Sequence, residues 1–343
     1  MIKFNLNLTH ERRIRTDRMP KKYFEPTRSK LAQAAFAVAF LLTSCGNRVN
    51  PAPKPPPPPP FEFLGSWGVK GNGPGQLDAP VSFSADSLGN VFFADPSAGF
   101  VHKFESNGTP LLSFQEATVR RAAGIAVDTG GAIYVANAQQ GSIFIYFPDG
   151  AFFQAWRAAP QRHFSGALGF GIDENGDVFL PDPAKSRVMK LSNRGRLLKT
   201  WPAPEKAASP DERPALISAE PDNFIFVAYA STGRVEKFSS DGSLATSWIA
   251  AGTPTGETGS GPSSITGLAA AGDFVFTMAA SSSQIRVWTT DGQHKLDADL
   301  GPSIGAIAAP QIAVTPRSEL LVFDPAAPKI YRFRLHLTSQ GPL

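Results

Sequence analysis

The fold is decided by three short segments, Val81-Ser-Phe-Ser-Ala-Asp86, Val91-Phe-Phe-Ala-Asp95 and Phe100-Val-His-Lys-Phe104. The next copy reads Gly124-Ile-Ala-Val-Asp128, Ile133-Tyr-Val-Ala-Asn137 and Ser142-Ile-Phe-Ile-Tyr146. Four further copies follow, the last three of them weaker, in which the position of Asp95 is taken by Asp182, Tyr229, Ala279 and Asp324. A unit of several short strands repeated at this spacing is typical of a β-propeller with one four-stranded sheet per unit. The sequence therefore predicts an all-β, six-bladed β-propeller of four-stranded antiparallel blades.

Tight turns join the strands of each copy, which we call a to d from the inside outward. Strands a and b are joined by Asp86-Ser-Leu-Gly-Asn90 and by similar turns after Asp128 and Asp173. Strands c and d are joined at Asn107-Gly108, Asp149-Gly150, Arg194-Gly195, Asp241-Gly242 and Asp291-Gly292. Asn-Gly and Asp-Gly tolerate the positive φ of tight hairpins. Each Asp that ends a strand a is expected to hydrogen-bond its own turn.

The sixth copy has no strand d after Phe333–Leu337, but a matching segment lies before the first copy. Phe63-Leu-Gly-Ser-Trp67 resembles the other d strands, most of which end near a Trp. We expect residues 61–67 to complete the last blade, because this pairing closes the ring and removes two exposed edges. One aromatic position repeated around a ring indicates packing between blades rather than ligand stacking. That role is predicted for Trp67, Trp156, Trp201 and Trp248.

A glycine-rich phrase before the first copy, Gly71-Asn-Gly-Pro-Gly-Gln-Leu77, completes the pattern. Together with Gly-Ile-Ala-Val-Asp and Val-Phe-Phe-Ala-Asp it resembles the NHL-repeat family of six-bladed propellers. The resemblance covers about residues 61–337 and is strongest in the first three copies. Tyr229 and Ala279 stand where the family has Asp.

The front of the chain is predicted to be a bacterial lipoprotein leader. Leu31–Leu42 is an apolar run preceded by Arg28 and Lys30, and it is too short to span a bilayer. It ends in Leu42-Thr43-Ser44-Cys45, which resembles the lipobox of bacterial lipoproteins. The resemblance implies that Cys45, the single cysteine, is diacylated and anchors the mature chain. Translation from Met1 or from Met19 is compatible with such a leader.

The predicted leader and the repeats divide the chain into three parts. Residues 1–44 are expected to be the signal peptide, 45–60 a lipidated spacer and 61–343 the propeller. Pro55–Pro60 is an unbroken run of prolines, and residues 51–60 in a polyproline II conformation would extend about 30 Å from a membrane. The expected location is the cell envelope, at the outer membrane on its periplasmic or surface face.

The positive charge of the chain resides in the leader. The formal charge is +4, but nine basic and three acidic residues lie in 1–44, which leaves 24 basic and 26 acidic residues in the mature part. A net charge of −2, together with export, argues against a nucleic-acid partner. A monomer is expected.

No catalytic, metal or cofactor site is predicted. The inner strands are built from Gly, Ser, Ala and apolar residues, whereas the Ca²⁺ of lactonase-type propellers needs several converging oxygen ligands. The zinc of amidating lyases needs histidines, and the histidines of the mature chain fall on unrelated segments: His102, His163, His294 and His336. For a streptogramin-type lyase, His163 is the single candidate histidine at the channel mouth, with no evident Glu beside it.

Two further sets of polar residues have simple interpretations. Asp95, Asn137, Asp182 and Asp324 end strand b, where each is expected to cap its own b–c loop rather than join a cation-binding ring. Basic residues gather in the connections between blades, on the usual binding face of propellers: Arg120, Arg121, Arg157, Arg162 and His163. Arginine suits carboxylate and phosphate recognition, although a solvated surface of mixed charge explains the set better.

The function indicated is a membrane-anchored envelope scaffold that binds a protein or an anionic glycan without catalysis. One alternative is a propeller-type lyase or lactonase that acts in the periplasm or outside the cell. The other is a structural or assembly subunit of an envelope complex. Recovery of one stable protein partner on purification would separate assembly from ligand binding.

Overall fold

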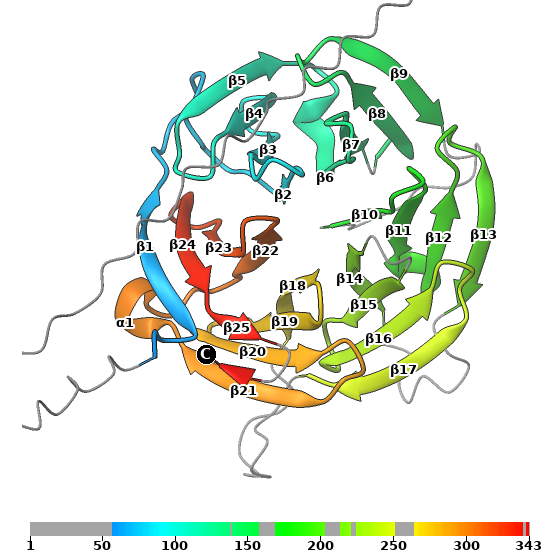
Figure 1. Ribbon diagram of the computed structural model, residues 1–343. Helices are drawn as coiled ribbons and strands as arrows, with labels where there is room; N and C mark the ends of the chain where they lie inside the picture. Colours follow the sequence, from blue (N-terminus) through cyan, green and yellow to red (C-terminus); the bar gives the residue numbers. More distant parts are fainter. Residues whose placement is uncertain are drawn as a thin grey trace, which may run out of the picture. The chain divides into compact units, whose positions relative to one another are not determined.

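The computed structural model describes residues 57–137, 139–157, 169–202, 213–220, 224–250, 264–338 and 341–342. The predictions for Cys45, the leader, Arg162 and His163 lie outside these residues. The described chain forms six four-stranded antiparallel sheets arranged as blades in a ring (Figure 1). The predicted fold class is therefore confirmed. In the described part no helix has the length and apolar character needed to span a membrane.

The first three blades follow the chain order from the channel outward. Blade 1 consists of β2 (Ser82–Ala85), β3 (Val91–Asp95), β4 (Phe100–Phe104) and β5 (Pro110–Gln115). Blade 2 consists of β6 (Ala122–Val127), β7 (Ile133–Asn137), β8 (Ser142–Tyr146) and β9 (Phe152–Arg157). Blade 3 consists of β10 (Gly171–Ile172), β11 (Val178–Asp182), β12 (Arg187–Leu191) and β13 (Leu197–Pro202).

The last three blades have the same arrangement, except that blade 6 takes its outer strand from the N-terminal side. Blade 4 consists of β14 (Pro214–Ala219), β15 (Phe224–Tyr229), β16 (Arg234–Ser239) and β17 (Leu244–Ile249). Blade 5 consists of β18 (Ile265–Ala271), β19 (Phe274–Ala279), β20 (Gln284–Thr289) and β21 (His294–Asp299). Blade 6 consists of β22 (Gln311–Thr315), β23 (Glu319–Asp324), β24 (Lys329–Leu335) and β1 (Phe61–Trp67).

Short elements complete the described chain. Two 3₁₀ turns, η1 (Val119–Arg121) and η2 (Pro183–Lys185), and one helical turn, α1 (Gly301–Ile304), lie in the connections. A small hairpin of β25 (Leu337–Thr338) and β26 (Gly341–Pro342) follows blade 6. The sequence did not predict this hairpin. Leu337 joins the core between blades 5 and 6 together with Phe61 and Ile304.

The core consists of layers between adjacent blades. Strands β3, β7 and β11 are buried along their whole length, because aromatic and β-branched residues point from both faces of each sheet into the neighbouring blades. One such layer joins Phe179 and Trp201 of blade 3 to Ile225 and Phe238 of blade 4. Burial between blades, rather than within one blade, therefore holds the ring together.

Strand β1 closes the ring, as the sequence predicted. It pairs antiparallel with β24 from Phe61 opposite Leu335 to Trp67 opposite Ile330, and the two lie side by side in blue and red in Figure 1. The Trp67 ring also contacts blade 1, with its centroid 4.9 Å from that of Phe104. Its indole N–H donates to the carbonyl of Ser106 at 2.8 Å. One strand thus completes blade 6 and fastens it to blade 1.

The repeated aromatic of strand d packs against a glycine in the c–d turn of the next blade. A Cβ atom added at any of five turn glycines would lie closer than 3.0 Å to such a ring. The pairs are Gly108 with Trp67, Gly150 with Phe114, Gly195 with Trp156, Gly242 with Trp201 and Gly292 with Trp248. The predicted packing role of the four tryptophans is confirmed. Glycine is required twice at these positions, for its positive φ and for the close approach of the ring.

Candidate functional site

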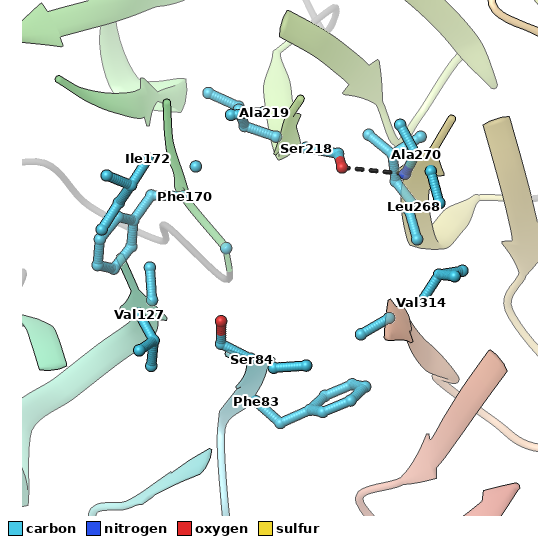
Figure 2. Close-up of a pocket in the computed structure, with 18 of the residues that line it drawn as sticks. Phe83, Ser84, Val127, Phe170, Ile172, Ser218, Ala219, Leu268, Ala270 and Val314 are labelled. Carbon is cyan, nitrogen blue, oxygen red and sulfur yellow. Dashed lines mark hydrogen bonds between the residues drawn. The ribbon is translucent and has the colours of Figure 1, made fainter. Parts of the chain in front are cut away.

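A central cavity of about 530 Å³ runs along the inner strands of all six blades. Apolar and small side chains form most of its wall, and Figure 2 shows Phe83, Val127, Phe170, Leu268 and Val314 around the opening. The wall is apolar because each strand a alternates between core residues and small or half-buried apolar ones. These residues agree with the Gly, Ser, Ala and apolar composition that the sequence analysis gave for the inner strands.

Serine hydroxyls in the wall connect neighbouring blades. Ser218 Oγ accepts the Ala270 N–H at 3.0 Å, as drawn in Figure 2, and Ser82 Oγ accepts the Ile125 N–H at 3.5 Å. Gln311 Nε2 donates to the Val81 carbonyl at 3.0 Å. These bonds satisfy backbone groups at the inner edge of the sheets. The hydroxyls of Ser82 and Ser218 therefore fix the channel wall.

Carboxylates mark the end of the channel where strands a turn into strands b, which we call the turn-face mouth. Asp86, Asp128 and Asp173 each accept the backbone N–H groups two and four residues later through Oδ1, at 2.8–3.0 Å. Their predicted role in bonding the a–b turns is confirmed. Lys103 Nζ lies 3.8 Å from Asp86 and Lys190 Nζ lies 4.0 Å from Asp173.

The mouth also gathers two acidic residues that the sequence analysis did not single out. Glu174 and Glu220 line the cavity beside the three aspartates. Glu220 takes the repeat position of Asp86, Asp128 and Asp173, and that register could have identified it. Glu174 is the residue after Asp173 and has no such signal. The described lining residues include five carboxylates and no Lys, Arg or His. Burial raises the pKa of Asp173, although the Asp177 N–H bonded to it acts in the opposite direction.

The histidines do not converge in the described chain. His102 is fully buried on β4, where Nδ1 lies 2.8 Å from Ser113 Oγ. Burial lowers the pKa of its imidazole to about 4, although the nearby Asp95 carboxylate opposes this. His294 pairs with Asp297 at 2.8 Å and His336 with Glu62 at 3.0 Å. Among the described residues, no group of three or more His, Cys, Asp or Glu is arranged to hold a metal ion.

The residues that end strand b make local contacts. Asp95 is fully buried, and Oδ2 accepts the Asp78 N–H at 2.7 Å. Asn137 accepts the Gln140 N–H at 3.0 Å, and Asp324 accepts the Ala326 N–H at 2.9 Å. The bonds of Asn137 and Asp324 agree with the predicted loop-capping role. Asp95 accepts one bond within its own loop, from Ser97 Oγ at 2.5 Å, but its bond to Asp78 ties strand b to the segment before β2, which the sequence did not predict.

Asp182 contacts strand c rather than a loop N–H in the described structure. Its Oδ2 accepts a hydrogen bond from Arg187 Nε at 2.9 Å, and the carboxylate is almost fully buried. The set of four residues therefore stabilises individual blades, but it does so in more than one way.

Three residues of the predicted basic surface lie on the face where each strand d connects to the next blade, which we call the connection face. Arg120 and Arg121 are exposed on η1, whereas Arg157 is the last residue of β9 and not part of a loop. Arg120 lies over Gly99 and donates to the Ser97 carbonyl at 3.2 Å. Its guanidinium is therefore partly engaged by blade 1. Arg162 and His163 lie outside the described residues.

Comparisons with known proteins identify the class of fold. No family model and no curated protein matches the chain. A solved streptogramin B lyase is 19% identical with a TM-score of 0.56, over 81% of this chain and 88% of that one. Virginiamycin B lyase from Staphylococcus aureus is 16% identical with a TM-score of 0.57, over 82% and 86%. The Neurospora crassa Pan2 WD40 domain is 12% identical with a TM-score of 0.52, over 80% and 94%.

These likenesses show a six-bladed β-propeller related in architecture to the virginiamycin B lyases. At such identities they show the fold alone, because one propeller scaffold carries many unrelated activities.

Proposed function

We propose that this protein is a non-catalytic binding propeller, held at the cell envelope by lipid on Cys45, and that its connection face receives the partner. The observation that carries the proposal is the contrast between the two ends of the ring. On one face, the c–d pairs of blades 1 to 5 and the first a–b pairs are joined by short glycine turns. On the other, the segments between blades span residues 116–121, 158–170, 203–213, 250–264 and 300–310.

Unequal connections on a regular scaffold are the usual carriers of binding function. The c–d turn glycines are fixed by the aromatic rings packed against them, so those turns have little freedom to vary. The connections differ from blade to blade in length and sequence. A macromolecular partner therefore finds its specific contacts on the connection face.

The charge of the described connection face favours an anionic partner. Arg121 and Arg157 are exposed there, and Arg120 adds its charge from the edge of blade 1. Arginine forms paired hydrogen bonds to carboxylates. The partner that fits is an acidic protein segment, with an anionic glycan as the alternative. Rim charges of this kind act together, and salt weakens them.

The test compares two triple variants with equal loss of charge. One carries Arg120→Ala, Arg121→Ala and Arg157→Ala on the connection face. The control carries Arg194→Ala, Arg196→Ala and Arg317→Ala, which are exposed arginines in turns of the opposite face. Both are isolated from the membrane fraction by affinity purification after cross-linking. We expect partners captured by the parent and the control to be lost from the first variant; equal recovery by both variants would contradict the proposal.

The anchor is tested separately. Cys45→Ser should leave the chain unprocessed or release it from the membrane fraction, because two or three acyl chains anchor stably where one does not. A variant that fractionates and migrates like the parent would disprove lipidation at Cys45.

A lyase is the second candidate, because two of the solved structures with this fold are streptogramin B and virginiamycin B lyases, and one was solved with quinupristin. The purified chain is incubated with quinupristin, and intact antibiotic is followed by liquid chromatography. We expect no loss above a heat-treated control. Turnover that depends on His163 would favour the lyase instead.

A further inference from the structure

We propose that the central cavity is a second binding site, which takes an elongated apolar molecule with a positive charge at one end. The apolar part lies along the channel and the charged end lies at the turn-face mouth. This site is on the opposite side of the ring from the proposed partner surface, so the inference goes beyond the proposed function. It rests on the cavity wall, on its rigidity and on the distribution of charge along it.

The wall is suited to an apolar molecule. Val127, Ile172 and Val314 are half-buried and line the opening (Figure 2). Behind them, Phe83, Phe170 and Leu268 are almost fully buried between blades. The cavity of about 530 Å³ falls within the range of sites that enclose small organic ligands. When a hydrocarbon chain covers this apolar surface, water is released from it, and that release favours binding.

The packing of the inner strands also forms the cavity wall before any ligand binds. Gly171 is packed so closely on blade 4 that an added Cβ would lie 2.6 Å from the Ala219 side chain. Gly267 is similarly close to Ile312 of blade 6, at 3.2 Å. Hydrogen bonds that Ser82 and Ser218 accept from backbone N–H groups of the next blade fix adjacent inner strands. A preformed cavity binds without the cost of ordering its own walls.

Charge selects the orientation and the sign of the ligand. The carboxylates of the lining come from blades 1 to 4 and gather at one mouth: Asp86, Asp128, Asp173, Glu174 and Glu220. Lys103 and Lys190 approach two of them from strand c, but neither lysine lines the cavity. Low-dielectric walls concentrate the field of such a mouth. A cationic end is therefore attracted, and an anionic end is repelled.

One carboxylate oxygen at this mouth is under-satisfied within the described structure. Asp173 is 3% exposed, and its Oδ2 accepts no hydrogen bond there. Its nearest cation, Lys190 Nζ, lies 4.0 Å away and is shared with Asp177 at 3.0 Å. Its negative charge is therefore only partly compensated and adds to the field at the mouth.

The experiment uses the neutral fluorescent probe N-phenyl-1-naphthylamine and three competitors with the same chain: decylammonium, decanol and decanoate. The purified protein should enhance probe fluorescence saturably. Decylammonium should displace the probe best and decanoate worst, with at least about a tenfold difference that shrinks as salt is raised. Absence of probe binding, or equal displacement by decanoate and decylammonium, would overturn the proposal.

Two blocking variants place the site in the channel. Ala270→Trp and the smaller change Val314→Phe fill the cavity, and the control Ala245→Trp adds the same indole to the exposed outer strand β17. We expect the blocking variants to lose probe binding while the control retains it. Only variants with the circular dichroism spectrum of the parent are compared, and unchanged probe binding by a folded blocking variant would refute the location.

A charge variant separates selectivity from apolar binding. Glu174→Gln together with Glu220→Gln leaves the apolar wall intact. We expect probe affinity to stay within about twofold of the parent while the preference for decylammonium over decanoate falls severalfold. Retention of the full preference would show that the mouth does not select the charge. None of these residues lies on the connection face. A negative result in these ligand-binding experiments would therefore not count against the proposal that the connection face binds a partner.

Discussion

The contact between turn glycines and the preceding blade's aromatic ring can be tested in blade 3 with two glycines of equal backbone conformation. Gly176 and Gly195 both have φ of +74°. An alanine at either position carries the strain of the left-handed region, about 1–2 kcal/mol. At Gly176 the new Cβ would lie 3.2 Å from the Asn193 Cβ, which a small shift relieves. At Gly195 it would lie 2.6 Å from Trp156 Cδ2, inside the ring's van der Waals surface.

Overpacking of this kind costs a further ~1–3 kcal/mol. Gly176→Ala should therefore lower the free energy of unfolding by about 1–2 kcal/mol, and Gly195→Ala by roughly 2–5 kcal/mol. Urea unfolding at 25 °C, followed by tryptophan fluorescence, gives both values. Trp156→Ala removes Cγ and Cδ2, two of the three atoms nearest to the added Cβ, so Gly195→Ala should cost less in that background by about 1 kcal/mol or more. Equal costs for the two alanines, or additive effects in the double variant, would refute this account of blade packing.

Three further outcomes are expected. A chain lacking residues 61–67 should melt at a much lower temperature or aggregate, because blade 6 is left with an open edge, whereas loss of residues 46–58 should leave the melting temperature unchanged; equal melting of the two would contradict ring closure by β1. His102 should make stability depend on pH: its folded pKa of about 4 is below the unfolded value of 6.5, so its contribution is full above pH 6.5 and is lost as pH falls towards 4. His102→Gln should remove up to about 3 kcal/mol of that pH dependence, and urea titrations at pH 4.5 and 7 that show the same dependence in both proteins would argue against it. Elemental analysis of the purified protein should find no stoichiometric Ca²⁺ or Zn²⁺, and one bound ion per chain would favour the enzyme alternatives.

The architecture is predictable from sequence because each blade repeats the same local pattern. Apolar segments separated by glycine turns predict the strands, and the phrase ending at Trp67 predicts the closure of the ring. The resemblance to NHL repeats remains a prediction, since no family model matches. The role of the tryptophans is also predictable, since one position repeated around a ring must meet the same neighbour each time.

The candidate sites are less accessible to sequence reasoning. Glu174 and Glu220 are 46 residues apart and become neighbours of one mouth only because the ring brings successive strands a together. The partial engagement of Arg120 by Ser97 depends on how η1 lies against blade 1. The short β10 also departs from the regular repeat, although the sequence of its copy is well preserved. Such features depend on contacts between blades. The repeat of the sequence pattern predicts the blades themselves but not these contacts.

Closure by β1 has a consequence for the order in which the molecule can be completed. His336 and Glu62 contact each other although they lie 274 positions apart in the chain. Phe61–Trp67 must therefore wait without its native neighbour until Lys329–Leu335 has been synthesised. Contacts of such separation form slowly, and an apolar strand that waits is available for wrong pairing. The step most exposed to misassembly, and most in need of a chaperone, is thus the meeting of the two ends.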